Sequence, residues 1–112
     1  MVEKQRSIQE YVPGKQVTLA HLIANPEARL CELIGLDRAR AVGIMTLTPS
    51  ETSIIAGDLA TKYAAVELGF LDRFTGTLVF TGEVAAVETA LARIVDYLST
   101  TLGYSAAPVT RS

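Results

Sequence analysis

Apolar and polar residues alternate along several stretches of the chain, which is typical of β-strands with one buried face. This alternation predicts a strand over residues 15–24, and further strands are predicted over residues 39–47, 66–74 and 76–81. A hairpin-like turn at Thr75-Gly76 joins the last two. In the first strand the alternation sorts the side chains into two faces. One face carries Val17, Leu19, His21 and Ile23, and the other carries Thr18, Ala20, Leu22 and Ala24.

A helix is predicted directly after the first of these strands. Asn25 suits its N-cap, Pro26 suits its first helical position, and Glu27 would face the positive end of the helix dipole. Gly35 is expected to end it. The residues expected to point into the core are Leu30, Leu33 and Ile34.

A second helix is predicted after the strand over 39–47. Thr48 suits its N-cap, Pro49 its first position, and Glu51 would complete a capping box. The helix would run to about Ala64. Its apolar positions at helical spacing are Ile55, Leu59 and Tyr63.

The longest helix is predicted between Val84 and about Leu102, where Gly103 would end it. Apolar residues follow the helical period throughout this stretch. They are Val84, Val87, Leu91, Ile94, Val95, Leu98 and Leu102. A short extended tail follows over residues 104–109. Strands and helices mixed in one short chain predict an α+β fold, with a sheet covered by helices on one face.

A further short strand is predicted near the N-terminus, over Ile8–Val12, before a turn at Pro13-Gly14. Such a strand is not stable alone and must pair with another. Its alternation leaves two choices for the buried set. These are Ile8, Glu10 and Val12, or Gln9 and Tyr11.

Composition limits the classes of function. The chain has 112 residues, 49% of them hydrophobic, which suits one globular domain. A net charge of −2 argues against a nucleic-acid partner, which would favour a basic protein. The single cysteine favours a cytoplasmic protein. No apolar stretch approaches the roughly 18 residues of a membrane span, and the polar start shows no signal peptide.

The sequence offers no combination of residues that favours an enzyme or a cofactor site. His21 has neither an orienting acid nor a nucleophile at a useful spacing, so a packed or interface histidine is favoured. Cys31 is interpreted as a small buried hydrophobic residue. Asp58 and Lys62 form an ordinary helical charge pair. One cysteine and one histidine argue against a metal site that needs several such ligands from one chain.

The link between the last two strands is the most unusual segment. It contains two charges and an aromatic residue between apolar strands. Its residues are Asp72, Arg73, Phe74, Thr75 and Gly76. Local grounds leave two interpretations open: a solvated turn, or a loop directed at a shared axis or a ligand.

Three segments resemble one family. Residues 8–26, 44–51 and 69–76 are similar to the circularly permuted bacterial microcompartment shell proteins of propanediol-, ethanolamine- and choline-utilisation compartments. Two tripeptides, Glu10-Tyr11-Val12 and Phe74-Thr75-Gly76, resemble the propanediol-utilisation type more than the ethanolamine-utilisation type. The resemblance covers about Ile8 to Arg111, and it implies that the segment 15–35 comes first here but last in the unpermuted domain. It divides the chain into an N-terminal segment, 1–14, and a shell domain, 15–112.

The resemblance implies a structural protein whose hexamers tile into a shell, with other shell proteins and encapsulated enzymes as further partners, and neither nucleic acid nor membrane. It implies that Asp72–Gly76 faces the central pore. Six copies of Ile8–Val12 would form a parallel β-barrel over that pore, leaving no free strand edge. It implies that Lys62 lies at the contact between hexamers.

Two positions depart from patterns within the family. Asn25 stands where many shell proteins carry an edge arginine, and Arg40 stands where ethanolamine-type relatives carry a glycine associated with a bent hexamer. Arg40 therefore suggests a flat hexamer. The alternative hypothesis is a small-molecule-binding regulatory module with a ferredoxin-like core, dimeric, with Asp72–Gly76 as its ligand contact.

Overall fold

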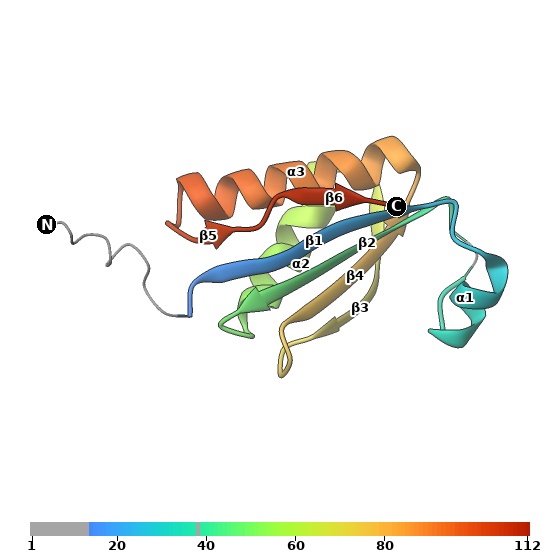
Figure 1. The fold of residues 1–112 in the computed structure, drawn as a ribbon, viewed down its shortest axis with the longest axis horizontal. Coiled ribbons are helices and arrows are strands. Elements are labelled where there is room, and N and C mark those ends of the chain that lie inside the picture. Colours follow the sequence, from blue (N-terminus) through green and yellow to red (C-terminus); the bar gives the residue numbers. More distant parts are fainter. Residues whose placement is uncertain (1–13, 38) are drawn as a thin grey trace, which may run out of the picture.

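The computed structural model describes residues 14–37 and 39–112. The predicted strand Ile8–Val12 lies outside these residues. The described chain forms one mixed sheet with two long helices on one of its faces (Figure 1). The predicted α+β class, with a sheet covered by helices on one face, is therefore confirmed.

The sheet has six strands, and its central order is β3-β4-β2-β1-β5, with β6 also paired to β1. Neighbours among β1 to β4 are antiparallel, whereas β5 and β6 run parallel to β1. The strands are β1 (Gln16–Ala24), β2 (Ala41–Thr48), β3 (Val66–Asp72), β4 (Thr77–Gly82), β5 (Ser105–Ala106) and β6 (Val109–Arg111). The four predicted strands are confirmed, and the extended tail also joins the sheet.

The predicted faces of β1 are wrong at two residues, Val17 and Thr18, because Thr18 is exposed and its hydroxyl lies 2.6 Å from that of Thr46. The pairing of β1 with β2 shifts register between Val17 and Leu19, so a bulge interrupts the strict alternation. Val17 therefore lies in the core with Ala20 and Leu22, and not on the face of His21.

The helices α2 (Thr52–Tyr63) and α3 (Val84–Thr100) cover the sheet face that contains the core. The predicted period of α3 is confirmed, because its buried residues recur every three or four positions. They are Val87, Ala90, Leu91, Ile94 and Leu98. The largest fully buried side chain, Phe80 of β4, belongs to the same core.

The prediction for α2 needs two corrections. The helix begins at Thr52 and not beside Thr48, which belongs to β2, and no side chain caps its N-terminus. Its buried face consists of small residues, whereas Ile55 is exposed. Those residues are Thr52, Ser53, Ala56, Gly57 and Ala60. They let the helix approach the sheet closely: a Cβ on Gly57 would lie 2.8 Å from a methyl carbon of Leu71.

The helix α1 (Ala28–Leu33) begins later than predicted and faces the other way. Asn25 is not its N-cap but has a left-handed backbone (φ 50°), and Glu27 occupies the cap position without a side-chain hydrogen bond. Cys31 is the buried residue of the helix, as expected of a small hydrophobic side chain. The prediction that Leu30, Leu33 and Ile34 point inward is wrong, because all three are exposed.

The strand register separates two ends of the sheet. At one end Gln16 pairs with Thr48, and Asp72 pairs with Thr77 across the β3–β4 hairpin. We call this the hairpin end. The described chain enters β1 here, and α2 begins here after β2. Figure 1 shows the β3–β4 hairpin on the side of the sheet away from α1.

At the opposite end of the sheet, Ala24 pairs with Ala41, Ala41 with Gly82, and Gly82 with Val66. Helix α1 connects β1 to β2 at this end, which we call the α1 end. The C-terminus of α2 also lies here, because the chain passes from Tyr63 directly into β3 at Val66.

Candidate functional site

The loop of the β3–β4 hairpin is organised by the side chain of Asp72. Its Oδ1 accepts hydrogen bonds from the backbone N–H groups of Phe74 (2.9 Å) and Thr75 (3.2 Å). These bonds, first that from Phe74, favour the charged carboxylate and lower the pKa of Asp72 below its ordinary value. The backbone carbonyl of Asp72 also accepts from the N–H of Gly76 at 2.9 Å. One residue therefore fixes both the entry and the exit of the loop.

The loop is also held against the neighbouring strand β2. The N–H of Leu47 donates to the carbonyl of Gly76 at 2.9 Å. Gly76 has a left-handed backbone (φ 81°), and a Cβ on it would collide with the carbonyl oxygen of Leu47. Only glycine combines this conformation with this close approach.

At the tip, the loop exposes an aromatic and a cationic side chain. The Phe74 side chain is 78% exposed, more than any other large hydrophobic residue of the described chain. The guanidinium carbon of Arg73 lies 4.9 Å from the centre of the Phe74 ring, a cation–π distance. The loop therefore presents an apolar ring and a guanidinium group together to the solvent.

The other predicted site residues lie at the α1 end. Lys62, near the C-terminus of α2, pairs with Asp58 at 2.8 Å. This hydrogen bond, together with the Asp58 charge, raises the pKa of Lys62 above its ordinary value. Both side chains are more than half exposed, so this pair adds little to stability.

Asn25 and Arg40 are brought together at the same end. The N–H of Asn25 donates to the carbonyl of Arg40 at 2.7 Å, closing the segment that carries α1. The two residues, with Pro26 and Ala39, line a hollow of about 520 Å³. Their proximity follows from the β1–β2 register and was not predictable from sequence spacing.

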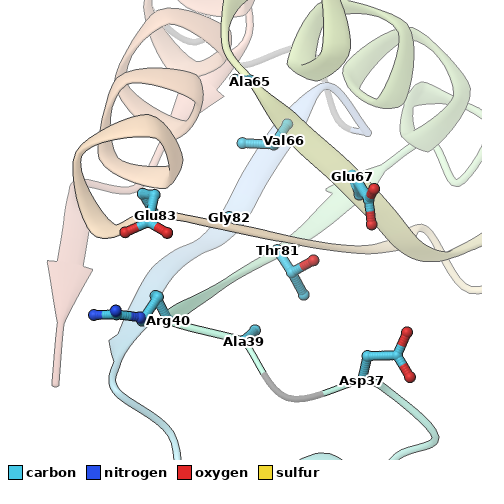
Figure 2. Close-up of a pocket in the computed structure, with 9 residues that line it drawn as sticks. All are labelled: Asp37, Ala39, Arg40, Ala65, Val66, Glu67, Thr81, Gly82 and Glu83. Atoms are coloured by element: carbon cyan, nitrogen blue, oxygen red, sulfur yellow. The ribbon is translucent and has the colours of Figure 1, made fainter.

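Next to them is an open hollow of about 640 Å³ with mixed charge (Figure 2). Arg40 and Asp37 lie on opposite sides of it, and the strand residues are contributed by β3 and β4. Its lining consists of Asp37, Ala39, Arg40, Ala65, Val66, Glu67, Thr81, Gly82 and Glu83.

The remaining candidates have structural surroundings. The Nδ1 and Nε2 atoms of His21 lie 2.6 Å and 2.8 Å from the hydroxyl oxygens of Thr110 and Ser112, so the ring ties the C-terminal strand to β1. Sequence reasoning missed this tie, and it missed a buried hydrogen bond of 2.8 Å between the hydroxyl groups of Thr52 and Tyr104. Both join segments far apart in the sequence, so no local pattern signals them.

Within residues 14–37 and 39–112, no group of three or more His, Cys, Asp or Glu side chains is arranged to hold a metal ion. Among the helices of this described part, none is long and apolar enough to cross a membrane.

Comparison with known proteins identifies the family. Residues 41–109, more than half of the chain, match the BMC domain. The chain is 58% identical over 111 residues to the bacterial microcompartment shell protein EutS of Escherichia coli strain K12, covering 99% of this chain and 100% of that protein. It is 58% identical over 108 residues to the shell protein PduU of Salmonella typhimurium strain LT2, covering 96% and 93%.

A solved structure described as the flat hexamer of CutR, form 2, has a TM-score of 0.87 against this chain at 48% identity, with 90% of this chain and 86% of that chain covered. The fold and the family match together define a BMC-domain protein. The chain belongs to this family, as a bacterial microcompartment shell protein of the type that includes EutS, PduU and CutR.

This membership confirms the interpretation as a structural protein rather than an enzyme, and it replaces the alternative of a regulatory module. It also places the chain in a microcompartment shell. The domain match begins at Ala41, so β1 and α1 precede it, as a permuted order requires. Identity is the same, 58%, to EutS and to PduU, so the preference for the propanediol type stays a prediction.

Proposed function

We propose that this chain is the subunit of a cyclic hexamer in which the hairpin end faces the central axis and the α1 end forms the outer rim. The observation that carries the proposal is that the predicted residues lie at two opposite ends of one sheet. The loop Asp72–Gly76 lies at one end, and Lys62, Asn25 and Arg40 lie at the other.

The hexameric state is supported by the CutR relative, whose solved assemblies include two flat hexamers. A closed ring needs one contact repeated around a single axis, which buries both contacting surfaces of every subunit. In such a ring six copies of the ordered hairpin loop converge, and the exposed Phe74 and Arg73 side chains line the opening. The resulting pore combines an apolar constriction with cationic charge.

The N-terminal segment fits the same arrangement. The described chain enters β1 at Gln16, which is at the hairpin end. The first described residue, Gly14, which precedes the shell domain 15–112, therefore lies on the side of the proposed pore. Six strands Ile8–Val12 can form a closed parallel barrel there, which removes their free edges and restricts passage through the pore.

The rim of the ring forms the contact with neighbouring hexamers and with other shell proteins. Lys62 is exposed there, and Asn25 and Arg40 lie at the same end of the sheet. Arg40 takes the curvature position, and we expect a flat ring. Encapsulated enzymes are partners for the face of the shell that points inward.

The experiment that tests the orientation is cross-linking through introduced cysteines. Phe74→Cys places a thiol at the loop tip, whereas the native Cys31 is 2% exposed and reacts poorly. Glu88→Cys, exposed on α3, is the matched control. With a short bis-maleimide, Phe74→Cys hexamers should give covalent dimers, and Glu88→Cys hexamers should not. Phe74→Cys hexamers, intact in native mass spectrometry, whose introduced thiols never cross-link would disprove the pore position.

A further inference from the structure

Helix α1 exposes an apolar stripe that a helix of its sequence would be expected to bury. Leu30, Leu33 and Ile34 lie at positions i, i+3 and i+4, and so share one face of the helix. Their side chains are 37%, 68% and 41% exposed. We call these three residues the α1 stripe. The stripe is exposed because α1 packs against the rest of the protein through a different side of the helix.

The orientation of α1 is fixed by two anchors. Cys31, which lies about 100° around the helix from Leu30, is 2% exposed. Leu36, just after the helix, lies over β3, because a Cβ on Gly69 would come within 2.6 Å of its methyl carbon. The backbone N–H of Leu36 donates to the carbonyl of Cys31 at 2.9 Å, which links the two anchors. The α1 stripe is therefore held outward by packing on a different side of the helix.

The position of α1 decides where the stripe can make contact. It connects β1 to β2 at the end of the sheet remote from the hairpin loop, and it projects beyond the sheet, apart from α2 and α3 (Figure 1). If the hairpin end faces the axis of a ring, the stripe lies at the perimeter. Neighbours within the ring flank each subunit, whereas a partner at the perimeter belongs to another ring.

We infer that the α1 stripe is a docking surface for the α1 stripe of a second copy of this chain in an adjacent hexamer. The inference rests on the proposed function, because the ring is what places α1 at the rim. Edge-to-edge contact of two identical rings is isologous, so the same patch meets itself. Three aliphatic side chains on each partner then form an apolar centre, and the exposed Lys62 lies at the same end of the molecule.

The charges of α1 fit a second copy better than other partners. Within the helix, Arg29 and Glu32 are exposed and carry opposite charges, so two copies that approach meet no field of one sign. An anionic lipid surface would favour a cationic rim around the stripe, which α1 lacks. The described chain enters β1 at the opposite end of the sheet, where Gln16 pairs with Thr48.

The test compares two serine substitutions of exposed apolar residues. Leu33→Ser alters the stripe, and Ile55→Ser, 41% exposed at the hairpin end of α2, is the matched control. Association between hexamers is measured by sedimentation velocity, and extended sheets are observed by electron microscopy. Leu33→Ser should keep the hexamer and weaken association between hexamers by at least about tenfold, since each contact loses two leucines. Ile55→Ser should match the wild type.

A second measurement identifies the partner directly. In assembled sheets, oxidation of Leu33→Cys should give covalent dimers of the chain, whereas Ile55→Cys should give none. A bridge between different hexamers is recognised by mixing isotope-labelled and unlabelled hexamers, because it joins a heavy and a light subunit.

Several results would overturn the inference. The first is that the Leu33→Ser variant forms extended sheets as well as the wild type does. The second is that wild-type hexamers do not associate with one another. The third is that the Leu33→Ser variant loses the hexamer itself, which would place α1 at a contact inside the ring. A wild-type chain that forms no hexamer would instead refute the proposed function, so the two failures are distinguishable.

Discussion

Replacing Gly76 by alanine tests whether the hairpin loop is fixed against β2. The backbone of Gly76 is left-handed (φ 81°), which costs a residue with a Cβ about 1–2 kcal/mol. The added methyl group would also collide with the carbonyl oxygen of Leu47. Relief of that collision pulls Gly76 away from β2 and breaks the hydrogen bond from the Leu47 N–H, which costs about 1–3 kcal/mol more where the groups are buried.

Gly103 provides a matched control at almost the same backbone angle. Its φ is 76°, but a Cβ there would meet nothing within 4 Å. Gly103→Ala therefore carries the backbone cost alone, partly offset by about 0.4–1 kcal/mol because alanine restricts the unfolded chain. We expect a loss of about 1 kcal/mol for Gly103→Ala and about 2–4 kcal/mol for Gly76→Ala.

The free energy of unfolding is measured by urea titration of both variants and the wild type at one protein concentration, because assembly adds to apparent stability. A loss of about 2–4 kcal/mol is a substantial part of the roughly 5–15 kcal/mol that stabilises a typical domain, so it is readily measured. Equal losses for the two variants would refute the reasoning, since they would show that the approach of Gly76 to Leu47 has no energetic consequence.

Two further predictions concern the proposed rim and pore. Lys62→Ala should leave the hexamer intact in native mass spectrometry but impair the formation of extended sheets; wild-type sheets would contradict its position at the rim. The pKa of Asp72 is lowered in the folded chain because its carboxylate accepts hydrogen bonds from Phe74 and Thr75. These bonds therefore stabilise the loop fully at pH values above the ordinary pKa of aspartate, about 3.9. The stabilisation is lost as the pH falls through the still lower pKa of the folded state. Amide resonances of Phe74 and Thr75 should shift over that acidic range in wild type and stay constant in Asp72→Asn; identical titrations would exclude the side chain as their partner.

Much of the fold could be predicted because its signals are local. The apolar period of α3 identifies that helix and its buried face, because helices repeat every 3.6 residues. The apolar runs of β2 and β4 identify two strands that are buried on both faces along part of their length. The resemblance of residues 8–26, 44–51 and 69–76 to shell proteins added the class of function, which composition and spacing alone left open.

Other features were decided only by tertiary structure. The bulge that moves Val17 into the core arises from the pairing of β1 with β2. The small buried face of α2 reflects how closely that helix approaches Leu71 across the sheet. The capping box at Thr48 did not form, because Thr48 remains paired with Gln16 in the sheet.

The α1 stripe shows most clearly where sequence reasoning reaches its limit. The spacing of Leu30, Leu33 and Ile34 determined that α1 is amphipathic, but it could not determine what its apolar face would meet. The strand register carries α1 beyond the sheet, where Cys31 and Leu36 fix its inner side and no core lies beneath its outer side. Periodicity is a property of neighbouring residues and is readable from the sequence, whereas the partner of an apolar face depends on contacts between distant segments, which only the folded chain establishes.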